Sequence, residues 1–133
     1  MIKPKAIIFD IDHTLLFPSD KPYKEHTVEG NTPLIALVSS LWRNTWNPTE
    51  VILLTGRHER LRKITEQECI ANNIFYDELI MNSTNNPIQQ WHISKAIDIQ
   101  PILEKYEIMA IIDDDEKCCE MYKLMWLPIL RVL

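Results

Sequence analysis

Residues 6–16 read Ala-Ile-Ile-Phe-Asp-Ile-Asp-His-Thr-Leu-Leu. A short β-branched apolar run is followed here by two carboxylates one residue apart, Asp10 and Asp12, and then by the hydroxyl of Thr14. A short, continuous apolar run of this kind predicts a strand that is buried on both faces, as in a parallel sheet. Ligands bind at the carboxyl ends of the strands in such sheets, so we expect these three side chains at a binding site.

The chemistry of the same stretch indicates phosphoryl transfer. A carboxylate can attack phosphorus to give an aspartyl-phosphate, and a second carboxylate beside it can act as general acid and base. Two anions that face a phosphate need a cation, and Mg²⁺ prefers carboxylate oxygens together with substrate phosphate. Asp10 and Asp12 therefore predict Mg²⁺-dependent phosphoryl transfer through aspartate.

Composition sets the limits of the interpretation. The 133 residues are enough for one domain, which we expect to span residues 1–133. The net charge of −5 argues against a general nucleic-acid coating protein but allows local contact with a phosphate end. The three cysteines have neither zinc-site spacing nor the pattern of a disulfide framework, which favours a reducing cytoplasm. We expect no membrane span and no signal peptide, because no apolar run is long enough and the first strand begins at once.

Strands and helices alternate along the chain. Short apolar runs predict strands at about 6–10, 51–54, 78–81, 108–112 and 128–132. Helical spacing predicts helices over 33–46, 58–72, 95–106 and 116–126, with Ser94 as a cap and Pro101 as a disturbance. This alternation is typical of βαβ units, so the fold class is α/β with a parallel sheet covered on both faces.

Two more strand ends carry candidate groups. The second strand ends in Thr55-Gly56-Arg57, where the glycine permits a tight turn and close approach to a ligand. Thr55 offers a hydroxyl and a backbone N–H to a phosphate oxygen, and Arg57 offers a guanidinium for bidentate bonds. Considered alone, this tripeptide favours an ordinary turn with a solvated arginine over a phosphate site, because Thr-Gly-Arg is a weak signal.

The fourth strand ends in Asp113-Asp114-Asp115-Glu116. Carboxylates directly after a buried strand are costly without a partner, and we assign Asp113 and Asp114 to a metal site. For Asp115 and Glu116 a second explanation stands beside the metal, because acidic residues are favoured at a helix N-terminus. Lys95, before this strand, is placed to neutralise an aspartyl-phosphate, although a surface lysine is the simpler explanation when it is considered alone.

Taken together, these residues resemble a known group. Asp-Ile-Asp-His-Thr, Leu-Leu-Thr-Gly-Arg, Lys95 and Ile-Ile-Asp-Asp occur in the order of the four motifs of the haloacid-dehalogenase-like (HAD) superfamily. The resemblance covers nearly the whole chain. It implies a Rossmann-like three-layer sandwich whose five-stranded parallel sheet has the order 5-4-1-2-3.

The resemblance also implies roles for single residues and a Mg²⁺ cofactor. Asp10 would be the nucleophile and a metal ligand, and Asp12 would be the acid/base with its backbone carbonyl on the metal. Thr55 and Lys95 would hold the transferring phosphoryl group, and the aspartates of the fourth motif would complete the metal site. His13 stands where this superfamily commonly has glycine, so a substrate contact by its side chain is an open alternative to a structural role.

The sequence leaves no room for a full cap domain between the motifs, so we expect an open site, which suits a large substrate. The second half of the chain, with Gly-Arg after strand two and paired aspartates before a Glu-Met-Tyr helix, resembles the phosphatase domain of phage-type polynucleotide kinase-phosphatases. That resemblance implies a phosphomonoester substrate, namely a nucleotide or the 3′-phosphate end of a nucleic acid. Asp115 departs from it, since arginine often follows the paired aspartates there.

Two alternatives stay open. The first is a small-metabolite phosphatase in which loop 17–32 acts as a minimal lid, and the second is a non-catalytic binding module on the same fold. Aromatic residues near the expected rim of the site could stack on bases, but the sequence does not single out one of Tyr23, Trp46 and Trp91.

Overall fold

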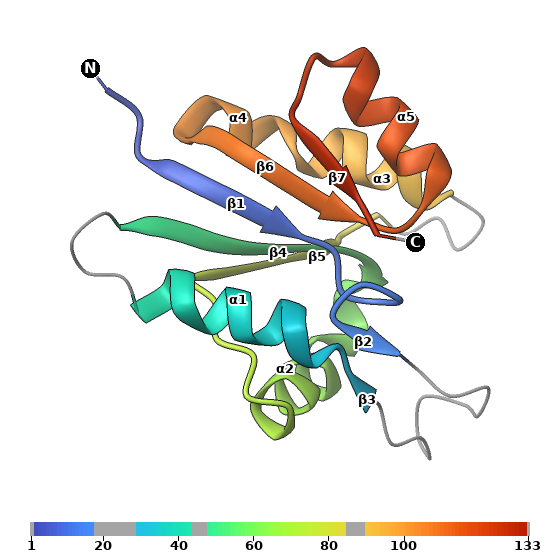
Figure 1. Cartoon of the computed structure of the whole chain (residues 1–133). Coiled ribbons are helices and arrows are strands. Elements are labelled where there is room, and N and C mark those ends of the chain that lie inside the picture. Colours follow the sequence, from blue (N-terminus) through green and yellow to red (C-terminus); the bar gives the residue numbers. More distant parts are fainter. Residues whose placement is uncertain (1, 18–28, 44–47, 85–89, 133) are drawn as a thin grey trace.

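A five-stranded sheet forms the centre of the fold (Figure 1). The computed structural model describes residues 2–17, 29–43, 48–84 and 90–132. The sheet has the order β5-β4-β1-β6-β7, and every pair in it is parallel. Counted along the chain these strands have the order 5-4-1-2-3, so the predicted Rossmann-like topology is confirmed. Their bounds are β1 (Lys5–Phe9), β4 (Thr49–His58), β5 (Glu78–Asn82), β6 (Glu107–Asp113) and β7 (Ile129–Arg131).

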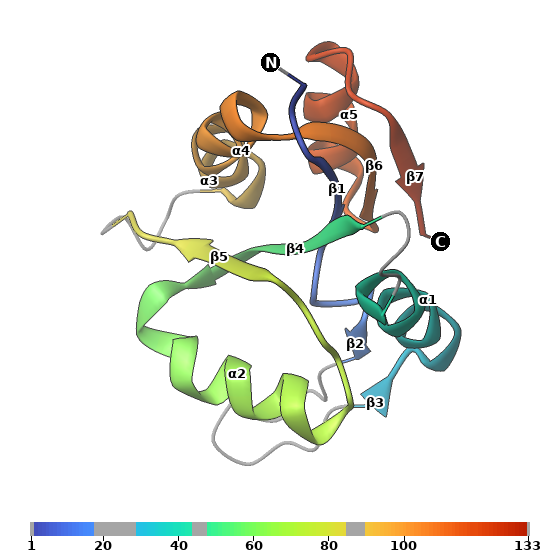
Figure 2. The ribbon, with the colours of Figure 1, turned by 90° about the vertical axis from the view of Figure 1, so that its left-hand side faces the viewer.

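Helices cover both faces of the sheet and complete three layers (Figures 1 and 2). One face carries α1 (Thr32–Arg43) and α2 (Arg62–Ala71), the latter preceded by the 3₁₀ turn η1 (Glu59–Leu61). The other face carries α3 (Trp91–Asp98), α4 (Gln100–Lys105) and α5 (Glu116–Leu124). Between β1 and α1 the described residues also form a small antiparallel pair, β2 (Leu16–Phe17) and β3 (Glu29–Gly30).

The strands divide their apolar side chains between two cores. Phe9 and Ile112 face the core shared with α1 and α2, whereas their neighbours Ile8 and Ile111 face the core shared with α3 to α5. Successive side chains of a strand point to opposite faces of a sheet, so a continuous apolar run is what a strand covered on both sides requires. This double burial fixes β1, β4 and β6 side by side and aligns their carboxyl ends.

The strand that carries Gly56 differs from the prediction. β4 does not turn at Gly56 but continues to His58, and its register against β5 shifts between Leu54 and His58. Irregularities of this kind re-aim side chains at the end of a strand. The interpretation of Gly56 as a tight-turn residue is therefore wrong.

The helix that carries Lys95 also starts elsewhere. α3 begins at Trp91 with Gln90 as its N-cap, so Ser94 lies inside the first turns and donates its hydroxyl to the carbonyl of Trp91 at 3.0 Å. The predicted cap at Ser94 is wrong. The disturbance predicted at Pro101 is confirmed, because the segment is divided into α3 and α4, with the proline in the first turn of α4. Proline is tolerated there, since the first helical N–H groups lack intrahelical partners.

No second domain lies over the site in the described residues. Between β1 and β4 these residues contain only β2, β3 and α1, and between β4 and β5 only η1 and α2. Within the same residues, no helix has the length and apolar character needed to cross a membrane.

Candidate active site

The centre of the site lies where β1 and β6 end side by side. Phe9 is paired with Ile112, and the backbone N–H of Asp10 donates to the carbonyl of Ile112 at 2.9 Å. Asp10 and Asp113 directly follow these paired residues, and both side chains are buried. The two carboxylates, which belong to different sequence motifs 103 residues apart, therefore meet at one edge of the sheet.

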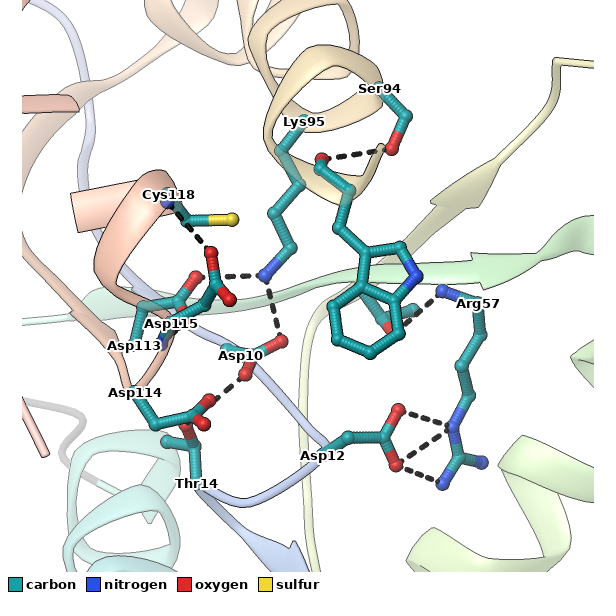
Figure 3. A network of polar contacts seen from close by, with 12 residues as sticks. Asp10, Asp12, Thr14, Arg57, Ser94, Lys95, Asp113, Asp114, Asp115 and Cys118 are labelled. Atoms are coloured by element: carbon teal, nitrogen blue, oxygen red, sulfur yellow. Dashed lines mark hydrogen bonds and ion pairs between the residues drawn. The ribbon is translucent and has the colours of Figure 1, made fainter. Parts of the chain in front are cut away.

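Lys95 bridges these two carboxylates. Its ammonium Nζ lies 2.8 Å from Asp10 Oδ1 and 2.8 Å from Asp113 Oδ2, and the residue is only 2 % exposed (Figure 3). Burial by itself lowers the pKa of a lysine, but the charges of Asp10 and Asp113 raise the pKa of Lys95 well above its ordinary value. Lys95 is thus a fixed buried cation and not a surface lysine.

A third carboxylate and a hydroxyl complete the cluster. The hydroxyl Oγ1 of Thr14 lies 3.2 Å from Asp10 Oδ2 and 3.2 Å from Asp114 Oδ1. A hydroxyl has a single proton, so it donates to only one of these oxygens at a time. Desolvation, opposed by Lys95, raises the pKa of Asp10 to about 6, and Asp114 adds to that rise. Desolvation, again opposed by Lys95, raises the pKa of Asp113 to about 6.

The donor set fits a hard divalent cation. Asp10, Asp113 and Asp114 each offer an oxygen, and these oxygens lie within 4.8 Å of one another. That spread is close to the ~4.2 Å between opposite ligands of an octahedral Mg²⁺ with bonds of about 2.1 Å. Three carboxylates face one ammonium, so the cluster carries excess negative charge that a metal ion would balance. The side chain of Asp12, which the sequence also assigned to the metal through its backbone carbonyl, is not part of this cluster.

Asp12 belongs to a second ion-pair centre. The Nε of Arg57 lies 2.9 Å from Asp12 Oδ2, and its Nη2 lies 2.7 Å from Asp12 Oδ1, a bidentate arrangement. The Nη1 of Arg57 donates to Thr65 Oγ1 at 3.1 Å and to Glu68 Oε2 at 2.5 Å. Burial lowers the pKa of Arg57, whereas the bonds to Asp12 and Glu68 raise it further, so the net shift is upward.

This centre changes the interpretation of Arg57. The sequence predicted a guanidinium that binds substrate phosphate, but the structure shows it buried and bonded to carboxylates of the protein. Thr65 and Glu68, both from α2, were missed. They lie three residues apart on an amphipathic helix, and nothing in that pattern distinguishes them from other helical positions facing the sheet.

The remaining predicted site residues lie around the same edge. Thr55 is buried, and its Oγ1 accepts the backbone N–H of Arg57 at 3.1 Å. His13 has a φ of 62°, in the left-handed region that favours glycine, and its side chain is exposed. Asp115 is the N-cap of α5, because its Oδ2 accepts the N–H of Cys118 at 2.9 Å. This cap accounts for Asp115 without a metal.

Gly56 makes room for Trp91. A Cβ on Gly56 would lie 2.8 Å from both Cγ and Cδ1 of the Trp91 indole, closer than real Cβ contacts allow. The glycine therefore lets an aromatic ring lie directly on the backbone of β4. This contact was not predicted, since the sequence does not show that α3 starts at Trp91.

These side chains surround a small recess of about 50 Å³. A single water needs about 10–15 Å³ by this kind of measure, so the recess has room for a group as large as a phosphate but not for a nucleoside. Its lining residues are Asp10, Asp12, His13, Gly56, Arg57, Trp91, Lys95, Asp114 and Asp115.

The sheet order, the carboxylates after β1 and β6, and the buried lysine between them define a HAD-like α/β domain. The sequence model of one family in this class, described as "Polynucleotide kinase PNKP phosphatase domain", matches residues 4–133. The chain therefore belongs to that family, which confirms the resemblance found in the sequence. No curated protein sequence matches the chain.

Two solved structures are similar to this chain over almost its whole length. One, titled "Structure of the Pnkp1/Rnl/Hen1 RNA repair complex", is 28% identical with a TM-score of 0.85, covering 98% of this chain and 42% of the other. The second, titled "Structure of Pnkp1/Rnl/Hen1 complex", is 30% identical with a TM-score of 0.84, covering 98% of this chain and 45% of the other. The chain thus spans less than half of the length of these relatives.

Proposed function

We propose that this domain hydrolyses the terminal 3′-phosphate of a polynucleotide, with Mg²⁺ as cofactor and an aspartyl-phosphate intermediate on Asp10. The observation that carries the proposal is the buried Lys95, held between Asp10 and Asp113 beside Asp114. Membership of the PNKP phosphatase domain family supports the substrate class.

In the first step, an oxygen of Asp10 attacks phosphorus, and the bond between phosphorus and the 3′ oxygen breaks. The ammonium of Lys95 lies 2.8 Å from Oδ1 of Asp10, so it orients the nucleophile and stabilises negative charge on the transferring group. Thr14, 3.2 Å from Oδ2, fixes the other oxygen of the same carboxylate. Both contacts limit rotation of the carboxylate, so the attacking oxygen is held in place.

Asp12 supplies the proton that the leaving 3′ oxygen needs. In the second step it takes a proton from water, whose oxygen attacks phosphorus and releases inorganic phosphate and the Asp10 carboxylate. The Arg57 fork holds both oxygens of Asp12, and Glu68 and Thr65 hold Arg57 in turn. In this role Arg57 is a positioning residue for the acid/base group.

The residues that would hold Mg²⁺ are Asp10, Asp113 and Asp114. The ion would neutralise phosphate charge as the bond to phosphorus forms. Because the described residues place no second domain above the recess, an extended strand can reach it. Both features suit a phosphate at the end of a large substrate.

The test is phosphate release by the purified chain with Mg²⁺, on a 3′-phosphorylated oligonucleotide beside nucleoside monophosphates and sugar phosphates. We expect the highest kcat/KM on the oligonucleotide end, and no release from the same oligonucleotide phosphorylated at its 5′ end instead. Preference for a monomer would contradict the substrate class. Absence of turnover on every ester, including an aryl phosphate, would contradict the enzymatic proposal itself.

A further inference from the structure

Trp91 stands at the mouth of the phosphate recess. It is the first residue of α3, one helical turn before Lys95, so the two side chains lie on the same side of the helix. Lys95 points into the buried cluster, whereas Trp91 lines the recess and is 57 % exposed. A large aromatic ring with half of its surface in water, next to an acidic cluster, is not accounted for by core packing.

The indole is held in position by the backbone of β4. A Cβ at Gly56 would come within 2.8 Å of the ring, so only glycine lets the ring lie against this strand. The carbonyl of Trp91 also accepts the hydroxyl of Ser94 at 3.0 Å, which fixes the first turn of α3. A ring that is pre-positioned in this way loses little conformational freedom when a ligand binds to it.

Trp91 also borders a second, larger recess. The phosphate recess of about 50 Å³ has no room for the nucleoside that carries the phosphate. The neighbouring recess measures about 330 Å³ and is lined by Gln90, Trp91, His92, Asp115 and Lys117. This value falls in the range of small-molecule sites, ~300–1,000 Å³. Trp91 and Asp115 line both recesses, so the two recesses adjoin at the indole.

We propose that Trp91 is the platform on which the base of the 3′-terminal nucleotide stacks while its phosphate occupies the recess. This inference rests on the proposed function and adds how the site distinguishes a nucleic-acid end from other phosphate esters. Every base has a π-face, so stacking on an indole tolerates any sequence. Selection then depends on the presence of a terminal base and not on its identity.

The experiment compares two oligonucleotides that carry the same 3′-phosphate, one with a terminal base and one with an abasic terminal nucleotide. We expect wild type to prefer the base-bearing end, and Trp91→Ala to reduce this preference in kcat/KM by about ten- to a hundredfold, mainly through KM. Trp91→Phe keeps a stacking surface and should retain most of the preference. The matched control is Trp126→Asn, which removes an exposed tryptophan that does not line the recess, at a left-handed position that asparagine tolerates.

Two results would overturn the inference. Equal losses on both oligonucleotides in Trp91→Ala would show that Trp91 only positions α3 and Lys95, and unchanged preference would show that the base does not contact it. The affinity of Asp10→Asn for a fluorescent 3′-phosphorylated oligonucleotide, measured with and without Trp91→Ala, tests the same stacking contact in the absence of turnover. If wild type releases no phosphate from any oligonucleotide, the proposed function fails, and this binding comparison still decides the role of Trp91.

Discussion

The two ion-pair centres at the carboxyl edge of the sheet use the same kinds of group in different ways. In the first, one lysine faces the carboxylates of Asp10 and Asp113, with Asp114 beside them. In the second, one arginine is bonded to Asp12, Glu68 and the hydroxyl of Thr65. Both cations are buried, at 2 % and 5 % exposed. Only the first centre gathers three carboxylate oxygens within 4.8 Å of one another.

The difference indicates what each centre can do. Burial raises the pKa of both Asp10 and Asp113 to about 6 despite the neighbouring lysine, so a further cation would stabilise the ionised carboxylates of the first centre. The fork of Arg57 already takes both oxygens of Asp12, so the second centre orients a side chain and offers no such ligand set. One loop, residues 10–14, therefore supplies Asp10 to the acidic cluster of the first centre and an oriented carboxylate, Asp12, to the second.

The largest effect should follow from removing the charge of the first centre at Asp10. Asp10→Asn keeps the shape of the side chain but removes the nucleophile, and we expect kcat for phosphate release to fall by at least about a thousandfold. The fold should be retained, because Lys95 still pairs with Asp113 and one of the crowded negative charges is gone. Thermal unfolding of the same preparation is the control, and near-normal turnover by a folded variant would exclude Asp10 as nucleophile.

Substitution of Arg57 in the second centre should lower the free energy of unfolding as well as kcat. Arg57→Ala leaves Asp12 and Glu68 without the cation between them, and we expect the free energy of unfolding to fall by roughly 3–5 kcal/mol. Arg57→Lys keeps the charge but loses the planar fork, so it should fold and lower kcat by about ten- to a hundredfold, because Asp12 is misplaced.

Denaturant unfolding and steady-state kinetics measure these two outcomes. Glu68→Gln is the matched control, since it keeps the Asp12–Arg57 fork while removing one charge, and it should lower kcat less than Arg57→Lys does. Wild-type kcat in Arg57→Lys would show that Asp12 does not depend on the fork.

The elements and the first centre could be predicted from the sequence because they depend on local patterns. Buried strands such as residues 6–9 are continuous apolar runs in the sequence. Once the two strands pair in parallel, residues 10 and 113 follow paired positions and lie together, whatever the positions of the helices. Lys95 could be assigned only through the resemblance, since its burial depends on how α3 packs against β4 and α5.

The second centre and the rim could not be predicted in the same way. Thr65 and Glu68 contact Arg57 because α2 folds back over β4. Local residue preferences do not predict this tertiary contact. Gly56 was expected in a turn, because glycine more often serves an unusual backbone conformation than the close approach of an aromatic ring. Tyr23 and Trp46, two of the aromatic residues expected near the rim, lie outside the described residues.

A smaller effect distinguishes the two centres by their response to Mg²⁺. The raised pKa values mean that the folded protein binds more protons than the unfolded chain between pH 3.8 and about 6, so without metal its stability should fall as pH rises through that range. Mg²⁺ needs the deprotonated carboxylates. We therefore expect Mg²⁺ to raise the melting temperature by a few degrees at pH 7.5 and hardly at all at pH 5.

Melting curves with and without Mg²⁺ at both pH values measure this effect. Asp114→Asn should weaken the Mg²⁺ shift at pH 7.5, whereas Glu68→Gln, in the second centre, should leave it intact. A shift of equal size at pH 5 and pH 7.5, or one lost in Glu68→Gln, would contradict the assignment of the metal to the first centre.

The smallest effect concerns a neutral partner of the Arg57 guanidinium, the hydroxyl of Thr65. The hydroxyl of Thr65 donates to the carbonyl of Leu61 at 2.8 Å and accepts from Arg57 at 3.1 Å, so it connects the centre to α2. Thr65→Val keeps the branched shape, and we expect it to lower the free energy of unfolding by about 1 kcal/mol and kcat by less than about threefold. Thr32→Val, at an exposed threonine of α1, should change stability by less than about 0.5 kcal/mol. A kcat in Thr65→Val as low as that of Arg57→Lys would mean that the hydroxyl, and not the two carboxylates, sets the orientation of the fork.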